Sequence, residues 1–247
     1  MSKPDKYANI AGRYARMIED DPKRKAFFRS LFERYGARSV LDCACGTGND
    51  LLLFRSMGYH VVGSDLSESM LQVASKLIKE HGAEIPLKKA DFHNLKAAHD
   101  ETFDVVACLS NSINEVEVDP VAALKSMTKV LNPDGIIVID QGQTDFTMKA
   151  PAVFAPIMNN EDLSRLFTMT YQGDIMTVNV FDFVHDEDTC NYDFSHSEFK
   201  IRIRLLKEWQ RIFQSSQLTA EYFGNWEAEP YNMMKSRRLI MVAKQKS

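Results

Sequence analysis

The sequence has few cysteines, little net charge and no long apolar run. Its 247 residues include only 4 cysteines, and 30 Lys and Arg residues stand against 34 Asp and Glu residues. Four cysteines are too few to form a disulfide scaffold at this length, so the core must be built from apolar side chains. The near-even charge balance supplies no basic field for a nucleic-acid backbone. These absences favour a globular protein that binds a small molecule and exclude fibrous, disordered and most nucleic-acid-binding classes.

No segment approaches the roughly 18 uninterrupted apolar residues that cross a bilayer, and residues 1–10 are polar. We therefore expect a cytoplasmic protein with no membrane partner. Cys43 and Cys45 are closely spaced, but no second Cys or His pair follows at zinc-site spacing. We expect these two cysteines, with Cys108 and Cys190, to be buried and reduced, and we expect no metal site.

Short apolar runs alternate with helical segments over much of the chain. Residues 1–36 predict two helices, the second starting at Asp21-Pro22, where a capping residue precedes a first-turn proline. From Ser39 the pattern predicts strands separated by helices, which is typical of parallel βαβ units. The five predicted strands are 39–43 (SVLDC), 60–65 (HVVGSD), 85–91 (IPLKKAD), 103–110 (FDVVACLS) and 135–142 (GIIVIDQG).

The alternation ends near Thr144. Three runs rich in β-branched and aromatic residues follow, at 165–173, 174–184 and 191–205, and they predict an antiparallel meander. A helix and two strands close the chain. We expect an N-terminal helical lid over 1–36, an α/β domain formed by 37–144 and 205–247, and a β insertion over 145–204 that covers the substrate pocket.

The strongest local signal is LDCACGTGND, residues 41–50, between the first predicted strand and a helix. Gly46 and Gly48 let the backbone take positive φ and approach a ligand, while the helix presents free N–H groups. A dinucleotide site requires a third glycine three residues later, where this chain has Leu51, so a pyrophosphate is disfavoured. Asp42, just before the glycines, favours a ligand with positive charge at this turn.

Two further carboxylates end the next predicted strands. Asp65 is placed to accept both hydroxyls of a ribose, and Asp91 to accept from the exocyclic amine of adenine, with Phe92 beside it as an apolar face. The alternative is that Asp65 and Asp91 are loop carboxylates or helix caps. A ribose, an adenine and a cationic tail together describe S-adenosylmethionine.

These motifs carry a family resemblance. In chain order, LDCACGTG, VVGSDLSESML, KADF, FDVVACLSNS and LNPDGIIVID resemble the successive motifs of class I S-adenosylmethionine-dependent methyltransferases. ACGTG, CLSNS and GNWEAEPY are most similar to the glycine N-methyltransferase group. The resemblance implies a doubly wound α/β fold, the Rossmann-like methyltransferase fold. Its sheet has seven strands, is mostly parallel with an antiparallel last strand, and carries an antiparallel β insertion.

The resemblance also implies roles for single residues. Asn111 would present its amide oxygen to an acceptor nitrogen, and Tyr231 would place its hydroxyl near the donor or the acceptor. Local capping by Asn111 and core packing by Tyr231 remain alternatives. Tyr14 would close over the cofactor or simply pack its helix. The expected cofactor-binding residues are Tyr14, Asp42, Ala44, Gly46, Gly48, Asp65, Leu66, Met70, Asp91, Phe92 and Leu109.

The acceptor side departs from the glycine N-methyltransferase pattern. That group holds the substrate carboxylate with an arginine just after the fifth strand, where this chain has Gly142. Arg202 and Arg204 alternate on a predicted strand and would share one face, either binding an anionic substrate group or facing solvent. We therefore expect methylation of a small-molecule amine larger than glycine. O-methylation, an NAD-dependent oxidoreductase and a non-catalytic S-adenosylmethionine-binding protein remain alternatives, and the oligomeric state is not readable.

Overall fold

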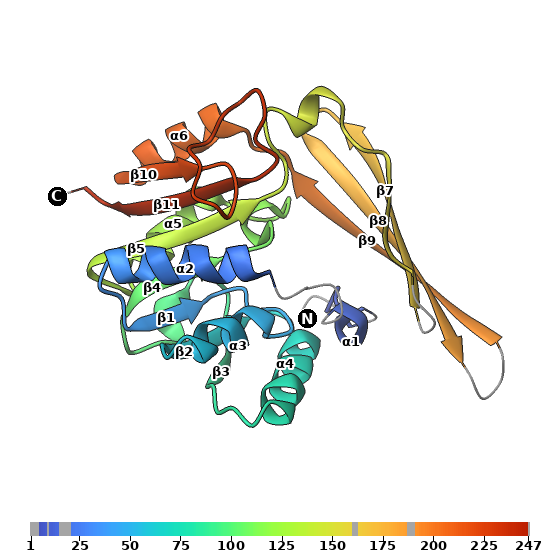
Figure 1. The fold of residues 1–247 in the computed structure, drawn as a ribbon, viewed down its shortest axis with the longest axis horizontal. Helices are drawn as coiled ribbons and strands as arrows, with labels where there is room; N and C mark the ends of the chain where they lie inside the picture. Colours follow the sequence, from blue (N-terminus) through green and yellow to red (C-terminus); the bar gives the residue numbers. More distant parts are fainter. Residues whose placement is uncertain (1–4, 9, 15–20, 160–162, 187–190, 247) are drawn as a thin grey trace.

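The computed structural model describes residues 5–8, 10–14, 21–159, 163–186 and 191–246, which form two β-sheets with flanking helices (Figure 1). One sheet has seven strands in the order β10-β11-β5-β4-β1-β2-β3, and the other has four in the order β6-β7-β8-β9. Within the described residues, no helix has the length and apolar character needed to cross a bilayer.

The seven-stranded sheet confirms the predicted doubly wound fold. Its strands β1 to β5 are parallel, whereas β11 runs antiparallel to both β5 and β10. The strands are β1 (Ser39–Asp42), β2 (His60–Asp65), β3 (Leu87–Lys89), β4 (Phe103–Cys108), β5 (Leu131–Gln141), β10 (Leu218–Phe223) and β11 (Leu239–Gln245). The strand order reverses between β1 and β4, which is where ligands bind in such sheets.

Helices cover both faces of this sheet. One core packs α2 (Pro22–Arg34), α3 (Asn49–Ser56) and α4 (Glu68–Glu80) on the first face, and a second core packs α5 (Pro120–Thr128) and α6 (Leu206–Ser215) on the other. Neighbouring residues of β1 serve opposite cores, Val40 the first and Leu41 the second. Helix α2 starts as predicted, because the Asp21 side chain accepts a hydrogen bond from the backbone N–H of Lys23 at 2.9 Å.

The β insertion is an antiparallel meander of four strands. They are β6 (Phe154–Asn159), β7 (Leu163–Gln172), β8 (Ile175–Asp186) and β9 (Asn191–Arg202). Strand β6 was not predicted, because Pro156 argues against a central strand; β6 lies at the sheet edge, where proline is tolerated. The predicted strand 191–205 was too long, since β9 ends at Arg202, and the predicted strand 85–91 is reduced to Leu87–Lys89.

The N-terminal segment connects the two sheets. Short helix α1 (Ala11–Tyr14) lies between α4 and the insertion (Figure 1). Asp5 accepts hydrogen bonds from the Ser67 hydroxyl at 2.9 Å and the Ser69 N–H at 3.0 Å, at the start of α4. At the other end the Tyr7 ring stacks on Phe199 of β9, with 5.1 Å between centroids. The segment thus holds the insertion against the carboxyl ends of the parallel strands.

Candidate active site

The glycine turn follows β1 and has the geometry of a ligand-binding loop. Gly46 has φ +52° and Gly48 has φ +86°, both in the left-handed region. A Cβ built on Gly46 meets open space, whereas a Cβ on Gly48 would lie 3.1 Å from the Ala74 Cβ of α4. Both glycines have the positive φ that the sequence predicts, and they differ from each other: Gly46 is free to face a ligand, while Gly48 also allows close packing of α4.

Leu51 takes the place of the third glycine of a dinucleotide site, and the space for it comes from the neighbouring strand. Gly63 of β2 would, with a Cβ, contact the Leu51 Cδ1 at 2.5 Å and the Leu87 Cδ2 at 2.8 Å. The small residue that this helix–strand packing requires is therefore Gly63 of β2 and not a residue of the helix. The turn itself is held by the Cys45 N–H, which donates to the Ser64 carbonyl at 3.0 Å.

Two carboxylates stand beside this turn at the ends of β1 and β2. Asp65 accepts from the Gly46 N–H through Oδ2 and from the Ser67 N–H through Oδ1, both at 2.8 Å. Burial raises its pKa despite these two bonds. Asp42 is almost fully buried, and burial, with the nearby charges of Asp50 and Asp65, raises its pKa well above the ordinary value. This end of the sheet is therefore short of positive charge.

An arginine–tryptophan stack borders the carboxylates, and the sequence motifs did not reveal it. Arg24 of α2 forms a two-pronged ion pair with Asp50 of α3, and Arg238 pairs with Asp140 at the end of β5. Both guanidinium groups stack on the Trp226 ring, at 5.2 Å and 5.0 Å from its centroid. The five residues come from four separate parts of the chain, since only Trp226 and Arg238 share a loop, so no spacing pattern could predict their meeting.

Asn111 lies in a strained turn after β4. Ser110 and Asn111 have φ values of +56° and +68°, a left-handed pair without glycine. Such a conformation costs of order 1–3 kcal/mol per residue and clusters at functional sites. Asp140 holds the turn, because its Oδ1 accepts from the Ser110 N–H at 2.7 Å. The Asn111 Oδ1 accepts from the Gly142 N–H at 3.3 Å, so its oxygen is oriented across the loop that follows β5.

Tyr231 also reaches this loop. Its hydroxyl donates to the Asp145 carboxylate at 2.9 Å and accepts from the Asp145 N–H at 3.0 Å. Burial, together with the Asp145 charge, raises the pKa of Tyr231 to about 12. Tyr231 is therefore a neutral hydroxyl that positions the loop after β5, next to Asn111.

The remaining predicted cofactor residues are spread around the same edge. Met70 and Leu109 are buried, whereas Leu66 is exposed. Ala44 and Phe92 are partly buried against the α5–α6 core. Asp91 is half exposed and accepts from the His93 N–H and ring nitrogen, both at 2.8 Å, so it has a local partner already. The side chain of Tyr14 lies outside the described part of the chain.

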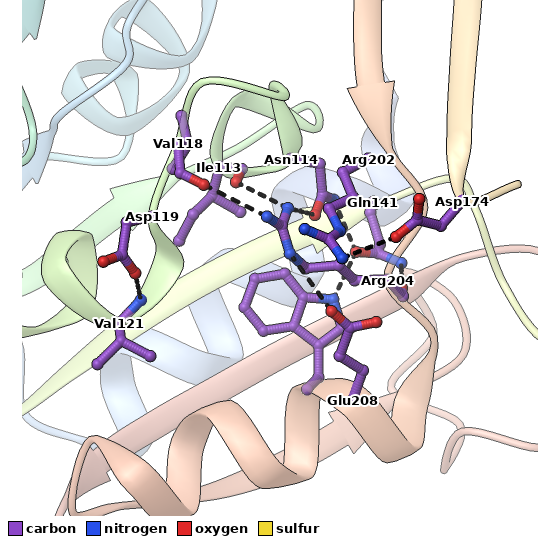
Figure 2. A network of polar contacts seen from close by, with 11 residues as sticks. Ile113, Asn114, Val118, Asp119, Val121, Gln141, Asp174, Arg202, Arg204 and Glu208 are labelled. Atoms are coloured by element: carbon purple, nitrogen blue, oxygen red, sulfur yellow. Dashed lines mark hydrogen bonds and ion pairs between the residues drawn. The ribbon is translucent and has the colours of Figure 1, made fainter. Parts of the chain in front are cut away.

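The prediction that Arg202 and Arg204 share one strand face is wrong, because β9 ends at Arg202. Figure 2 shows that Arg202 turns to Asp174, with which it pairs at 2.8 Å, and is half exposed. Arg204 is buried and donates to the Asn114 Oδ1 at 3.1 Å and to two backbone carbonyls of the loop after β4. The Arg204 guanidinium therefore anchors the chain at the point where it leaves the insertion. Burial lowers the pKa of Arg204.

The described cysteines are buried and reduced. Burial raises the pKa of the Cys43 and Cys45 thiols well above the ordinary value, so neither is poised as a thiolate. Cys108 is buried as well, and Cys190 lies outside the described residues. Within the described residues, no three or more His, Cys, Asp or Glu side chains form a group that could hold a metal ion.

Part of the chain is similar in sequence to known methyltransferases. Residues 40–135 match the methyltransferase domain family. The chain is 33% identical over 142 residues to a glycine/sarcosine N-methyltransferase of Parasynechococcus marenigrum (strain WH8102), covering 56% of this chain and 50% of the relative. It is 29% identical over 197 residues to the glycine N-methyltransferase of Mus musculus, covering 71% and 66%. The chain thus spans half to two thirds of the lengths of these relatives.

Solved structures share the whole architecture. A S-adenosylmethionine-dependent methyltransferase from Clostridium acetobutylicum ATCC 824 superposes with a TM-score of 0.82 at 19% identity, covering 98% of each chain. The sugar N-methyltransferase KedS8 from Streptoalloteichus sp ATCC 53650 gives 0.75 at 20% identity, covering 95% of this chain and 92% of that one. The match over residues 40–135 and the shared fold make the chain similar to the class I S-adenosylmethionine-dependent methyltransferases, a class whose methyl donor is S-adenosylmethionine.

Proposed function

We propose that this protein transfers a methyl group from S-adenosylmethionine to an amine nitrogen of a small molecule by direct in-line displacement. The observation that carries the proposal is the pair Asp42 and Asp65, a buried and a partly buried carboxylate with raised pKa values at the ends of adjacent strands. Their electrostatic cost is offset when a cationic, hydroxyl-bearing ligand binds between them and the open face of Gly46.

The polar groups at this edge match the chemistry of the donor. Asp65 would accept from the ribose hydroxyls, and Asp42 would stabilise the positive charge of the methionine moiety. Arg24 and Arg238 stack on Trp226, and each is already paired with a carboxylate of its own, so they border this site without supplying a free cation to the ligand. The bound cofactor supplies an electrophilic methyl group, and the protein supplies position and exclusion of water.

Little further catalysis by side chains is needed. Holding a neutral amine in line with a reactive methyl group contributes up to about 7–11 kcal/mol through pre-paid entropy and avoided solvent reorganisation. The Asn111 Oδ1, set by the strained turn, would accept an N–H of the amine and orient the nitrogen lone pair. Tyr231 would shape the acceptor pocket through its bonds to Asp145. The insertion and segment 5–14 would form the cover of this pocket.

The acceptor is an amine larger than glycine. By the resemblance, Gly142 stands where glycine N-methyltransferases have a carboxylate-binding arginine, and Arg204 is engaged with the loop after β4. A glycine carboxylate would therefore be desolvated without a partner, which is costly. The two relatives and the sugar methyltransferase described above are named N-methyltransferases, and these three names support nitrogen over oxygen as the methylated atom.

An acceptor panel tests this proposal. Glycine, sarcosine and larger amines, including amino sugars, are compared at saturating S-adenosylmethionine, alongside hydroxyl acceptors. We expect kcat/KM for glycine to be at least about a hundredfold below that of the best amine, as the loss of a charged contact near 3 kcal/mol requires. Glycine as the best acceptor would contradict the assignment of Gly142, and activity only on hydroxyls would replace N-methylation by O-methylation.

A further inference from the structure

The insertion sheet has two unlike faces. Its inner face, toward α1, buries Val178 and Val180 against Ile10. No described helix or strand covers the opposite face (Figure 1). Strand alternation and register place a ladder of six ring-bearing residues on it, paired across the two strands as Phe181–His196, Phe183–Phe194 and His185–Tyr192. We call these six residues the outer aromatic ladder.

The ladder is preassembled and exposed. Its three cross-strand ring pairs lie 4.9, 5.2 and 5.0 Å apart between centroids, so the rings support one another before any partner arrives. Phe183 is 37% exposed, Phe194 58% and Tyr192 67%, and Phe154 of β6, on the same face, is 57% exposed. These four rings leave roughly 400 Å² in solvent. That is about half of what each subunit buries in a standard interface of about 800 Å² per partner.

The pattern of the ladder is complementary to itself. In a symmetric pair of copies stacked face to face, the twofold axis lies parallel to the sheets, either along the strands or across them. With either axis, Phe183 and Phe194 of one copy lie opposite Phe183 and Phe194 of the other at the centre of the contact. At each end, a histidine of one copy lies opposite a phenylalanine or tyrosine of the other. The contacts made by one copy are thus the same as those made by the other, as an isologous interface requires. The ladder itself holds no carboxylate, ammonium or guanidinium group, and Glu198 and Lys200, next along this face of β9, pair with each other at 3.4 Å. Such a surface offers no charge for an acidic or basic partner.

We propose that the outer aromatic ladder is a homodimer interface, in which two copies of this chain pack the outer faces of their insertion sheets against each other. The self-complementary ring pattern carries this assignment, and the four exposed rings supply about half of the area that each subunit buries in a standard interface. In such a dimer both inner faces point away from the contact, so each active site stays within its own chain. Dimer formation and cofactor binding are then independent properties.

Sedimentation velocity on the full chain tests the proposal, at protein concentrations from about 1 to about 100 µM. The wild-type protein is expected to sediment as a dimer. Phe194→Glu places a charge at the centre of the contact and is expected to raise the dimer dissociation constant at least about thirtyfold, as loss of an aromatic hot spot does. Because Phe194 is exposed, the variant should keep the wild-type circular dichroism spectrum and the wild-type affinity for S-adenosylmethionine.

Two further variants make the result specific. Tyr192→Lys, at the end of the ladder, is expected to weaken the dimer as well. Met234→Glu is the matched control, because Met234 is an equally exposed apolar residue, 68% accessible, on the loop between β10 and β11. It should leave the dimer unchanged. A wild-type protein that is monomeric throughout the concentration range, or a Phe194→Glu protein that remains as dimeric as wild type, would overturn the proposal.

Discussion

The two sheets of this molecule differ in whether their buried charges are paired with an opposite charge. In the insertion, Arg165 and Asp182 are buried together, joined by two hydrogen bonds of 2.6 Å, and Arg13 lies 3.7 Å from the same carboxylate. At the carboxyl edge of the large sheet, burial raises the pKa of Asp42 and Asp65, and both carboxylates accept hydrogen bonds from backbone N–H groups.

The difference separates scaffold from binding site. A buried charge that is already paired gains nothing from a ligand, so the insertion pair serves to hold segment 5–14 against the sheet. A buried carboxylate without a cationic partner is stabilised by a cationic ligand. In the free protein it lowers the stability of the folded state, and such destabilising groups are typical of functional sites. The same chemical substitution should therefore have opposite effects on stability in the two sheets.

The largest effect is expected for Asp182→Asn. It leaves the Arg165 guanidinium buried without its counter-ion and should lower the free energy of unfolding by about 3–5 kcal/mol. Urea unfolding followed by fluorescence measures this change. Asp174→Asn is the control in the same sheet, because the Asp174–Arg202 pair is half exposed and should contribute less than about 1 kcal/mol. Equal effects of the two substitutions would show that the buried pair is not a scaffold element.

Asp65→Ala should weaken binding of S-adenosylmethionine. Loss of a charged acceptor for two ribose hydroxyls costs about 1.5–3 kcal/mol, which is ten- to a hundredfold in affinity. Isothermal titration calorimetry measures the dissociation constant, and Asp174→Ala, on the insertion, should leave it unchanged. An unaltered affinity in folded Asp65→Ala protein would refute the ribose assignment.

Asp42→Asn should stabilise the free protein while weakening cofactor binding about tenfold. Because burial raises the pKa of Asp42 above its ordinary value of 3.8, the contribution of Asp42 to the stability of the native state is fully present below pH 3.8 and is lost as pH rises through the raised pKa. The neutral amide removes this loss, so the free energy of unfolding near neutral pH should rise by about 1–2 kcal/mol. A variant that is less stable than wild type at neutral pH would contradict this account of Asp42.

The smallest effect is expected for metal removal. In-line methyl transfer to a neutral amine ionises no hydroxyl at a metal, and the described residues hold no cluster of metal ligands. Activity measured with the best acceptor should therefore be the same with and without EDTA. Activity that disappears with EDTA and returns with magnesium would place the protein among metal-dependent O-methyltransferases.

The part of the candidate site that faces the cofactor could be predicted from the sequence, because the motifs that indicate it are short and close together in the chain. The glycine turn, the strand before it and Asp65 all lie between Ser39 and Asp65, and hydrophobic periodicity defined the five parallel strands. The arginine–tryptophan stack could not be predicted, because Arg24 and Trp226 are brought together only by the packing of α2 against the loop after β10.

The acceptor half was harder for a different reason. Alternation of Arg202 and Arg204 with isoleucines continues the strand pattern past the point where β9 ends, so sequence alone could not show that Arg204 turns into the core. Likewise Pro156 masked an edge strand. Short periodic patterns report which residues alternate, but the point where a strand ends depends on contacts distant in the chain.

The central claim is that the carboxyl edge of the large sheet is a site short of positive charge, and proton release on cofactor binding tests it most directly. Titration calorimetry in two buffers of different ionisation enthalpy is run from about pH 5 to about pH 7, where the ligand's ammonium group stays protonated. Since a bound cation favours the charged form of Asp42 and Asp65, binding should release protons and tighten as pH rises. Asp42→Asn should reduce the release. Binding that exchanges no protons, or that weakens as pH rises in this range, would contradict the account.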